Sequence, residues 1–180
     1  MDFPVLIEKC RHGDHQAQSE FYRLLAPAIL GVCRRYLPDE HEAEDAMIQS
    51  MYKALTGLDT LRDGRTVQGW IRRIAVNECL MTLRRKKMDY REDGLEHVTT
   101  DEPDAQDKLQ AEEVLALLDQ LPLGYRTIFN LYAIEGYTHK EIGDILGISL
   151  NTSKSQLIQA RKKLTSWITE TKLSSSHDHA

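Results

Sequence analysis

Cysteine is scarce in this 180-residue sequence, which contains only Cys10, Cys33 and Cys79. The three residues are far apart and odd in number, and each lies in a helical apolar pattern, which excludes a disulfide framework or a cysteine metal site. Long apolar runs are also missing, since none approaches the roughly 20 residues that span a bilayer. The first residues, MDFPVLIEKC, lack the basic and then apolar pattern of a secretory signal. These absences predict a soluble protein of the cytoplasm, with its thiols reduced.

The motifs of common enzyme classes are absent as well. The sequence has no GxxxxGK[ST] phosphate-binding loop, no GxGxxG dinucleotide motif and no GxSxG nucleophile turn. His12 and His15 share a helix face, but no cysteine or carboxylate pair completes a metal site with them. We therefore expect no catalytic residues, no cofactor and no metal.

Apolar residues recur at helical spacing along most of the chain, whereas strand-like alternation is never sustained. Helices are expected over about 16–36, with Pro27 kinking or breaking this run, and over 40–58 and 67–87. Two more are expected over 109–121 and 125–134, before a pair of helices near the C-terminus. The predicted fold class is all-α.

Charge is unevenly distributed along the chain, whose net charge is −5. Residues 91–118 hold nine acidic and two basic side chains, whereas the flanking parts are close to neutral with local basic clusters. Residues 89–107 also lose helical periodicity, which predicts a flexible acidic linker. We expect two small helical domains, residues 1–88 and 108–170, joined by this linker, and a disordered tail at 171–180.

The segment GYTHKEIGDILGISLNTSKSQLIQARKKL, residues 136–164, has the pattern of a helix-turn-helix. Thr138 and Glu141 have the spacing of a capping box, and Gly147 suits the left-handed residue that ends a helix. Ser149 or Asn151 can cap the second helix. The positions of this helix that face inward by period are Ser153, Leu157, Ala160 and Leu164.

The outward arc of this second helix carries Lys154, Ser155, Ile158, Gln159 and Lys162. It has hydrogen-bond donors and no carboxylate, although acids outnumber bases in the chain. An ordinary helical hairpin with a solvated polar face is the alternative, but such a face normally mixes charges. The pattern favours insertion of this helix into a DNA major groove.

A second basic feature is the helix expected over 67–87, in which six cations fall within residues 72–87. Arg73, Asn77, Arg84 and Lys87 share one stripe, which predicts phosphate binding rather than mere compensation of the helix dipole. The preceding loop is a candidate polar pocket for an extruded base. This loop, residues 58–67, contains Asp59, Arg62, Asp63, Gly64 and Arg65.

Three segments, in this order and spacing, resemble the extracytoplasmic-function (ECF) sigma factors of the sigma-70 family. AEDAMIQSMYKAL at 43–55 resembles the family's AED..Q...KAL helix, and WIRRIAVNECLMTLRRKK at 70–87 resembles W(L/I)..IA.N......RR. EGYTHKEIGDILGISLNTSKSQLIQARKKL at 135–164 resembles EG.S..EIA..LG.S..TVKSRL.RAR..L. The chain departs from the last pattern at Ser153, where the family has valine, and at Gln156, where it has arginine. These departures suggest a less rigid recognition helix and one phosphate contact fewer.

The resemblance implies a promoter-specificity subunit that directs core RNA polymerase to specific promoters and helps open them. Residues 1–88 would bind core polymerase and the minus-ten element, and residues 108–170 the minus-thirty-five element. The implied partners are core RNA polymerase, promoter DNA as duplex and as melted single strand, and an anti-sigma factor, which is often membrane-bound in the family.

The same resemblance implies roles for individual residues. At the minus-thirty-five element these are Thr152, Lys154, Ser155, Ile158, Gln159, Arg161 and Lys162. At the minus-ten element they are Asp59, Arg62, Asp63, Arg65, Arg73, Asn77, Arg84 and Lys87. At core polymerase they are Glu44, Asp45 and Gln49.

Two other functions fit part of the pattern. A stand-alone helix-turn-helix transcriptional regulator would use residues 1–88 as a sensing or dimerisation domain, which has no need of the basic helix at 70–87. A helical adaptor such as an anti-regulator would show no salt-dependent binding of nucleic acid.

Overall fold

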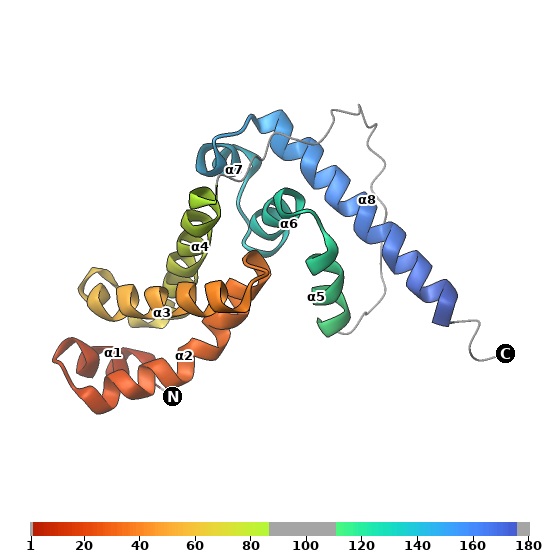
Figure 1. The fold of residues 1–180 in the computed structure, drawn as a ribbon. Coiled ribbons are helices and arrows are strands. Elements are labelled where there is room, and N and C mark those ends of the chain that lie inside the picture. Colours follow the sequence, from red (N-terminus) through yellow and green to blue (C-terminus); the bar gives the residue numbers. More distant parts are fainter. Residues whose placement is uncertain (1, 87–110, 176–180) are drawn as a thin grey trace. The chain divides into compact units, whose positions relative to one another are not determined.

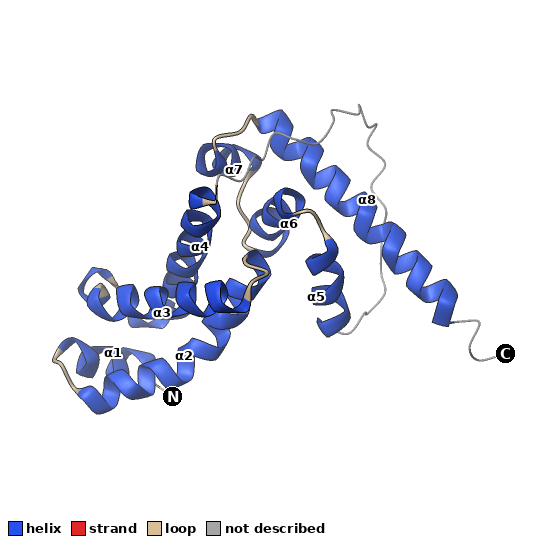
Figure 2. Cartoon of the chain, in the orientation of Figure 1, coloured by secondary structure: helices blue, strands red, loops and turns tan. Residues whose placement is uncertain are grey.

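The structure, a computed structural model, describes residues 2–86 and 111–175, with side chains described over 2–86 and 116–169. Within these residues the chain is helical and contains no strand, which confirms the all-α prediction (Figures 1 and 2). It divides into two compact units, Met1–Lys87 and Met88–Ala180. The expected acidic linker, 89–107, lies outside the described residues. No helix in the described part of the chain has both the length and the apolar content needed to cross a bilayer.

The first unit contains four helices, α1 (Phe3–Arg11), α2 (His15–Tyr36), α3 (Glu40–Thr56) and α4 (Val67–Arg85). Short 3-10 turns at Leu58–Thr60 and Gly64–Thr66 connect α3 to α4. Two aspartates start helices as expected of good N-caps. Asp14 accepts hydrogen bonds from the amides of Gln16 and Ala17, and Asp39 accepts one from the amide of Glu42.

The core of the first unit lies where α2, α3 and α4 pack on one another. It includes Phe21, Tyr36, Met51 and Ile71, each at most 1% exposed. Cys10, Cys33 and Cys79 are also buried in this unit, and all three are free thiols. A hydrogen bond with Cys33, together with burial, raises the pKa of Cys79 far above its usual range, so this thiol stays protonated.

Pro27 does not break α2, which continues as one helix to Tyr36. A proline inside a helix costs about 3 kcal/mol because it removes a backbone hydrogen bond and crowds the preceding turn. Phe21 and Leu25 before it, and Ile29 and Val32 after it, are all buried. Packing on both sides of Pro27 therefore holds the helix together across it.

The second unit contains α5 (Ala111–Gln120), α6 (Leu123–Phe129), α7 (His139–Leu146) and α8 (Leu150–Ser175). The helix expected over 125–134 is interrupted, because α6 ends at Phe129 and a π-helical turn, Asn130–Ile134, follows it. The last helix is longer than expected and continues to Ser175, five residues into the predicted tail.

The helix-turn-helix in this unit is confirmed as α7 and the first turns of α8 (Figure 1). Thr138 and Glu141 form the capping box: the Thr138 hydroxyl accepts from the Glu141 amide, and the Glu141 carboxylate accepts from the Thr138 amide at 2.8 Å. Gly147 has a φ of 69°, the left-handed conformation expected at the end of α7. A Cβ at Gly143 would lie 2.9 Å from the carbonyl oxygen of Ile148, so this glycine lets the turn approach α7 closely.

Candidate nucleic-acid interface

The buried side of α8 carries the four residues that helical period assigned to it. Ser153 and Ala160 are fully buried, Leu157 is 4% exposed and Leu164 is 9% exposed. This packing determines which residues of α8 face outward. The residues predicted to contact DNA comprise three exposed cations, Lys154, Arg161 and Lys162, and four half-buried side chains, Thr152, Ser155, Ile158 and Gln159.

Two of the exposed cations lie on one side of α8. Lys154 and Arg161 are seven residues apart, which places them two turns apart on nearly the same line of the helix. Neither forms an ion pair within the part of the chain that the structure describes. Their charges are therefore available for an anionic partner.

The start of α8 is fixed by hydroxyl groups. Of the two candidate caps, Ser149 performs the role, because its Oγ accepts a hydrogen bond of 2.9 Å from the Thr152 amide. The hydroxyls of Ser149 and Thr152 also lie 2.8 Å apart, and Ser155 donates to the carbonyl oxygen of Thr152 at 3.1 Å. A cap of this type stabilises a helix by about 1 kcal/mol.

The two departures from the family pattern have different outcomes. Gln156 is only 7% exposed, so this position contributes to packing within the unit instead of facing outward. Ser153 is fully buried, and its Oγ lies 2.9 Å from Nδ1 of His139, the first residue of α7. The hydroxyl is thus satisfied across the motif, and a loosened recognition helix does not follow from it.

The stripe predicted on α4 is present on its exposed side. Arg73, Asn77 and Arg84 are all exposed and fall within about 40° of one another around the helix axis. Lys87 lies outside the described residues. Lys86, which directly follows α4, forms an ion pair of 2.5 Å with Glu42 of α3.

The loop before α4 is organised around Asp63, which caps the second 3-10 turn. Its carboxylate accepts from the backbone amide of Arg65 at 3.0 Å and from Nε of the same residue at 3.1 Å. The side-chain hydrogen bond from Arg65, followed by the backbone bond, lowers the pKa of Asp63, so the carboxylate is charged at neutral pH. Asp59 and Arg62 of the same loop are both exposed.

Arg11 of α1 holds this loop in place and was not predicted from the sequence. Its guanidinium donates to the carbonyl oxygen of Leu58 at 2.9 and 3.2 Å and to that of Leu61 at 2.5 Å. It also forms an ion pair with Glu8. In sequence Arg11 resembles an ordinary cation at a helix C-terminus, and nothing local indicates contacts 47 and 50 residues away.

We expect Arg11→Ala to loosen residues 58–61, because three hydrogen bonds to their carbonyl groups disappear. Such bonds contribute about 1 kcal/mol each, so local opening should become roughly tenfold more frequent or more. Hydrogen exchange of the Thr60 and Leu61 amides measures this directly. Arg23→Ala is the matched control, since Arg23 pairs with Glu20 at the same spacing but contacts no loop. Equal exchange in both variants would show that Arg11 does not fix the loop.

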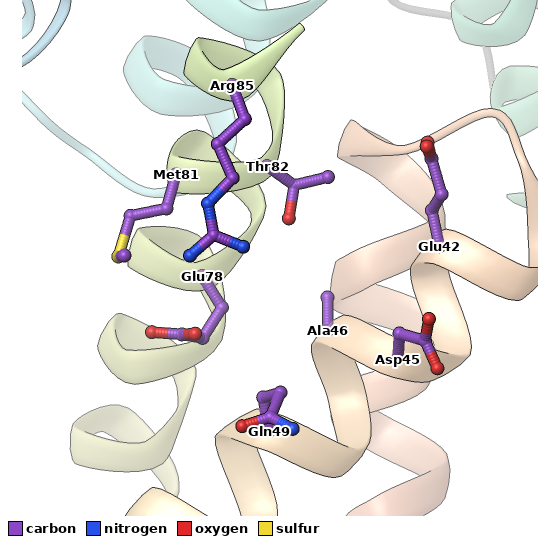
Figure 3. A pocket seen from close by; sticks show the side chains of 8 residues that line it. All are labelled: Glu42, Asp45, Ala46, Gln49, Glu78, Met81, Thr82 and Arg85. Atoms are coloured by element: carbon purple, nitrogen blue, oxygen red, sulfur yellow. The ribbon is translucent and has the colours of Figure 1, made fainter.

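A groove of about 460 Å³ lies between α3 and α4 (Figure 3). Asp45 and Gln49, two of the three residues predicted to bind polymerase, line it from α3, whereas Glu44 is half-buried and does not line it. Its other lining residues are Glu42, Ala46, Glu78, Met81, Thr82 and Arg85. An ion pair of 2.5 Å between Lys53 and Glu78 joins the two helices that form it.

Comparison with known proteins assigns both units to one family. Residues 21–88 match Sigma-70 region 2, and residues 111–164 match Sigma-70, region 4. The first match disfavours the alternative in which the N-terminal unit is a sensing domain.

Relatives align with nearly the whole chain. The sigma factor SigV of Bacillus subtilis is 30% identical over 165 residues, covering 89% of this chain and 90% of its own. The ECF RNA polymerase sigma factor SigW of the same organism is 29% identical over 172 residues, covering 88% of this chain and 92% of its own. The fold is similar to that of sigma factor RpoE in its complex with the anti-sigma factor NepR from Bartonella quintana. That match has a TM-score of 0.51 and 20% identity, and it covers 84% of this chain and 96% of the other. The chain therefore belongs to the extracytoplasmic-function RNA polymerase sigma factors of the sigma-70 family.

Proposed function

We propose that this sigma factor directs core RNA polymerase to specific promoters and helps open them, acting in the cytoplasm and without catalytic activity of its own. The observation that carries the proposal is the presence of two outward-facing cationic surfaces, one on α8 and one on α4, in a chain whose net charge is −5. Cations concentrated in this way are the electrostatic signature of nucleic-acid binding.

In the second unit, α8 is proposed to enter the major groove of the minus-thirty-five element. Lys154, Arg161 and Lys162 contact phosphates, which position the helix without reading sequence. Thr152 at the start of the helix adds a polar contact. Ser155, Ile158 and Gln159 face base edges, where the Ile158 side chain suits a thymine methyl group. Replacements at Ser155 or Gln159 are therefore expected to change sequence preference.

In the first unit, the loop and α4 are proposed to hold the opened minus-ten element. Arg73, Asn77, Arg84 and Lys87 follow the backbone of the displaced strand, because Arg73, Asn77 and Arg84 lie along the exposed side of α4. The loop residues Asp59, Arg62, Asp63 and Arg65 surround a flipped base. An extruded base needs hydrogen-bonding groups held in fixed positions, and the Asp63–Arg65 pair and the bonds from Arg11 provide this rigidity.

Helix α3 is proposed to dock on core polymerase through Glu44, Asp45 and Gln49, of which Asp45 and Gln49 line the groove. Acidic side chains at the groove suit a basic surface on the polymerase.

An anti-sigma factor, membrane-bound in many members of the family, is the proposed restraining partner.

Binding to matched promoter DNAs tests this proposal. With core polymerase present, the chain should bind a promoter whose minus-ten region is pre-melted more tightly than the same promoter as full duplex, and binding should weaken steeply with salt. Without polymerase, binding to either DNA should be weak. Tight duplex binding without polymerase would instead indicate a stand-alone regulator, and salt-independent behaviour in every mixture would indicate an adaptor.

A further inference from the structure

A stack of side chains connects three elements around the turn of the helix-turn-helix. The rings of Tyr132, in the π-helical turn, and His139, at the start of α7, lie with centroids 4.5 Å apart and planes inclined by 21°. Cζ of Arg161 on α8 lies 5.9 Å from the centroid of the Tyr132 ring. At its edge, the His139 ring reaches the Ser153 hydroxyl on α8 through Nδ1. The imidazole therefore contacts α8 directly at Ser153 and is linked to Arg161 through the Tyr132 ring.

The contact with Ser153 matters for the placement of α8. Ser153 is fully buried on the packed side of this helix. A buried hydroxyl without a partner costs more free energy than its hydrogen bond contributes, so α8 is favoured in the position that keeps the 2.9 Å contact. Ser153 and Lys154 are adjacent in sequence. A shift of α8 that broke this bond would therefore also move the predicted DNA-contacting side.

The contact with Tyr132 matters for the orientation of Arg161. A guanidinium within about 6 Å of an aromatic ring centroid gains a cation–π attraction. Arg161 is exposed, and without this ring its long side chain would sample many rotamers. Stacking against His139 holds the Tyr132 ring in place, so the arginine is ordered before DNA arrives.

We propose that His139 is a positioning residue for recognition of the minus-thirty-five element. Its hydrogen bond to Ser153 fixes the position of α8. Its stack with Tyr132 orients Arg161 toward a DNA phosphate. This inference rests on the proposed function, since it concerns how the DNA-contacting side of α8 is ordered before DNA binds. Histidine suits the role because one ring supplies both a flat face and a hydrogen-bonding nitrogen.

The charge state of the imidazole fits this role. Partial burial lowers the pKa of His139, and the positive charges of Lys154 and Arg161 lower it further. The ring is therefore neutral at pH 7 and above, and it adds no charge of its own to the phosphate contacts. Any effect of His139 on DNA binding therefore comes from the positions of Ser153 and Tyr132, which it contacts.

Two substitutions separate the two contacts. His139→Asn keeps a hydrogen-bonding group near the position of Nδ1 but removes the ring that stacks on Tyr132. His139→Phe keeps the stack but leaves the buried Ser153 hydroxyl without this partner. Adding Ser153→Val to His139→Phe replaces that hydroxyl by a methyl group, adds a second methyl group on Cβ, and should restore packing. His15→Asn, at an exposed position in the first unit, is the control for the change of residue type.

The test uses the full chain with core polymerase and a promoter duplex that the wild-type holoenzyme selects from a library randomised in the minus-thirty-five element. We expect His139→Asn to weaken binding about tenfold and to reduce the slope of log affinity against log salt by about one, because the Arg161 phosphate contact is lost. In an Arg161→Ala background the same substitution should leave the slope unchanged. His139→Phe should keep the wild-type slope, bind several-fold more weakly and recover with Ser153→Val.

Other outcomes overturn the inference. Affinity and slope equal to wild type in both His139 variants would show that the ring positions nothing. Weaker binding with the wild-type slope in His139→Asn, and no recovery by Ser153→Val, would indicate loss of stability alone, which circular dichroism and thermal unfolding would confirm. If the wild-type holoenzyme enriches no sequence from the library, the proposed function fails first, and the inference fails with it.

Discussion

Asp45→Arg is expected to abolish co-purification of this sigma factor with core RNA polymerase while leaving its fold intact. The Asp45 side chain is exposed at the groove between α3 and α4, so the substitution changes the charge of the proposed docking face without disturbing the core. Like charges placed together at an interface cost several kcal/mol, and each 1.4 kcal/mol is a factor of ten in affinity. We expect the dissociation constant for core polymerase to rise about 100-fold or more.

Glu40→Arg provides a matched control for this substitution. Glu40 is an exposed acid on the same helix but lies about 140° around it from Asp45. Its ion pair with Arg34 is on the surface, where such pairs contribute about 0–1 kcal/mol, so folding should survive here as well. Normal co-purification of Asp45→Arg, or equal loss in both variants, would show that the groove face is not the docking surface.

Lys154→Glu is expected to produce the largest loss of minus-thirty-five recognition among substitutions on α8. A phosphate contact becomes a repulsion, which should weaken binding about 100-fold and reduce the salt slope by up to about two, since two charges change. The loss should be similar for every promoter, because phosphate contacts carry no sequence information. Holoenzyme binding to several selected promoters across a salt series measures both effects.

Lys163→Glu makes the same charge change on the opposite flank of α8. Lys163 is exposed and nine residues from Lys154, which places the two side chains about 180° apart around the helix. We expect this variant to bind nearly as wild type does. If Lys163→Glu proved the more damaging of the two, the side of α8 assigned to DNA would be wrong.

The helix-turn-helix could be predicted because its determinants are local. The capping box at Thr138 and Glu141, the left-handed Gly147 and the buried period of α8 each depend on residues a few positions apart. The same holds for the stripe of α4, where helical period alone brings Arg73, Asn77 and Arg84 together.

The features that sequence did not predict depend on packing between distant residues. Arg11 contacts carbonyl groups about 50 residues away. His139 contacts Ser153 across the turn, and their separation of 14 residues in sequence matches no recognisable motif. Gln156 was expected to remove a phosphate contact that the family's arginine would make. Only the packing of the second unit reveals that the side chain at this position is buried. Pro27 was expected to kink or break α2, and it does not break it, because tertiary contacts outweigh local propensity there.

Run-off transcription with purified core polymerase tests the central claim most directly. The full chain, core polymerase and a library of promoter fragments are mixed with nucleotides, and the transcripts are mapped at their 5′ ends. We predict start sites that appear only when the chain is present and that share sequence elements near positions −10 and −35. If core polymerase with this chain begins transcription nowhere that core polymerase alone does not, the chain does not direct it to promoters.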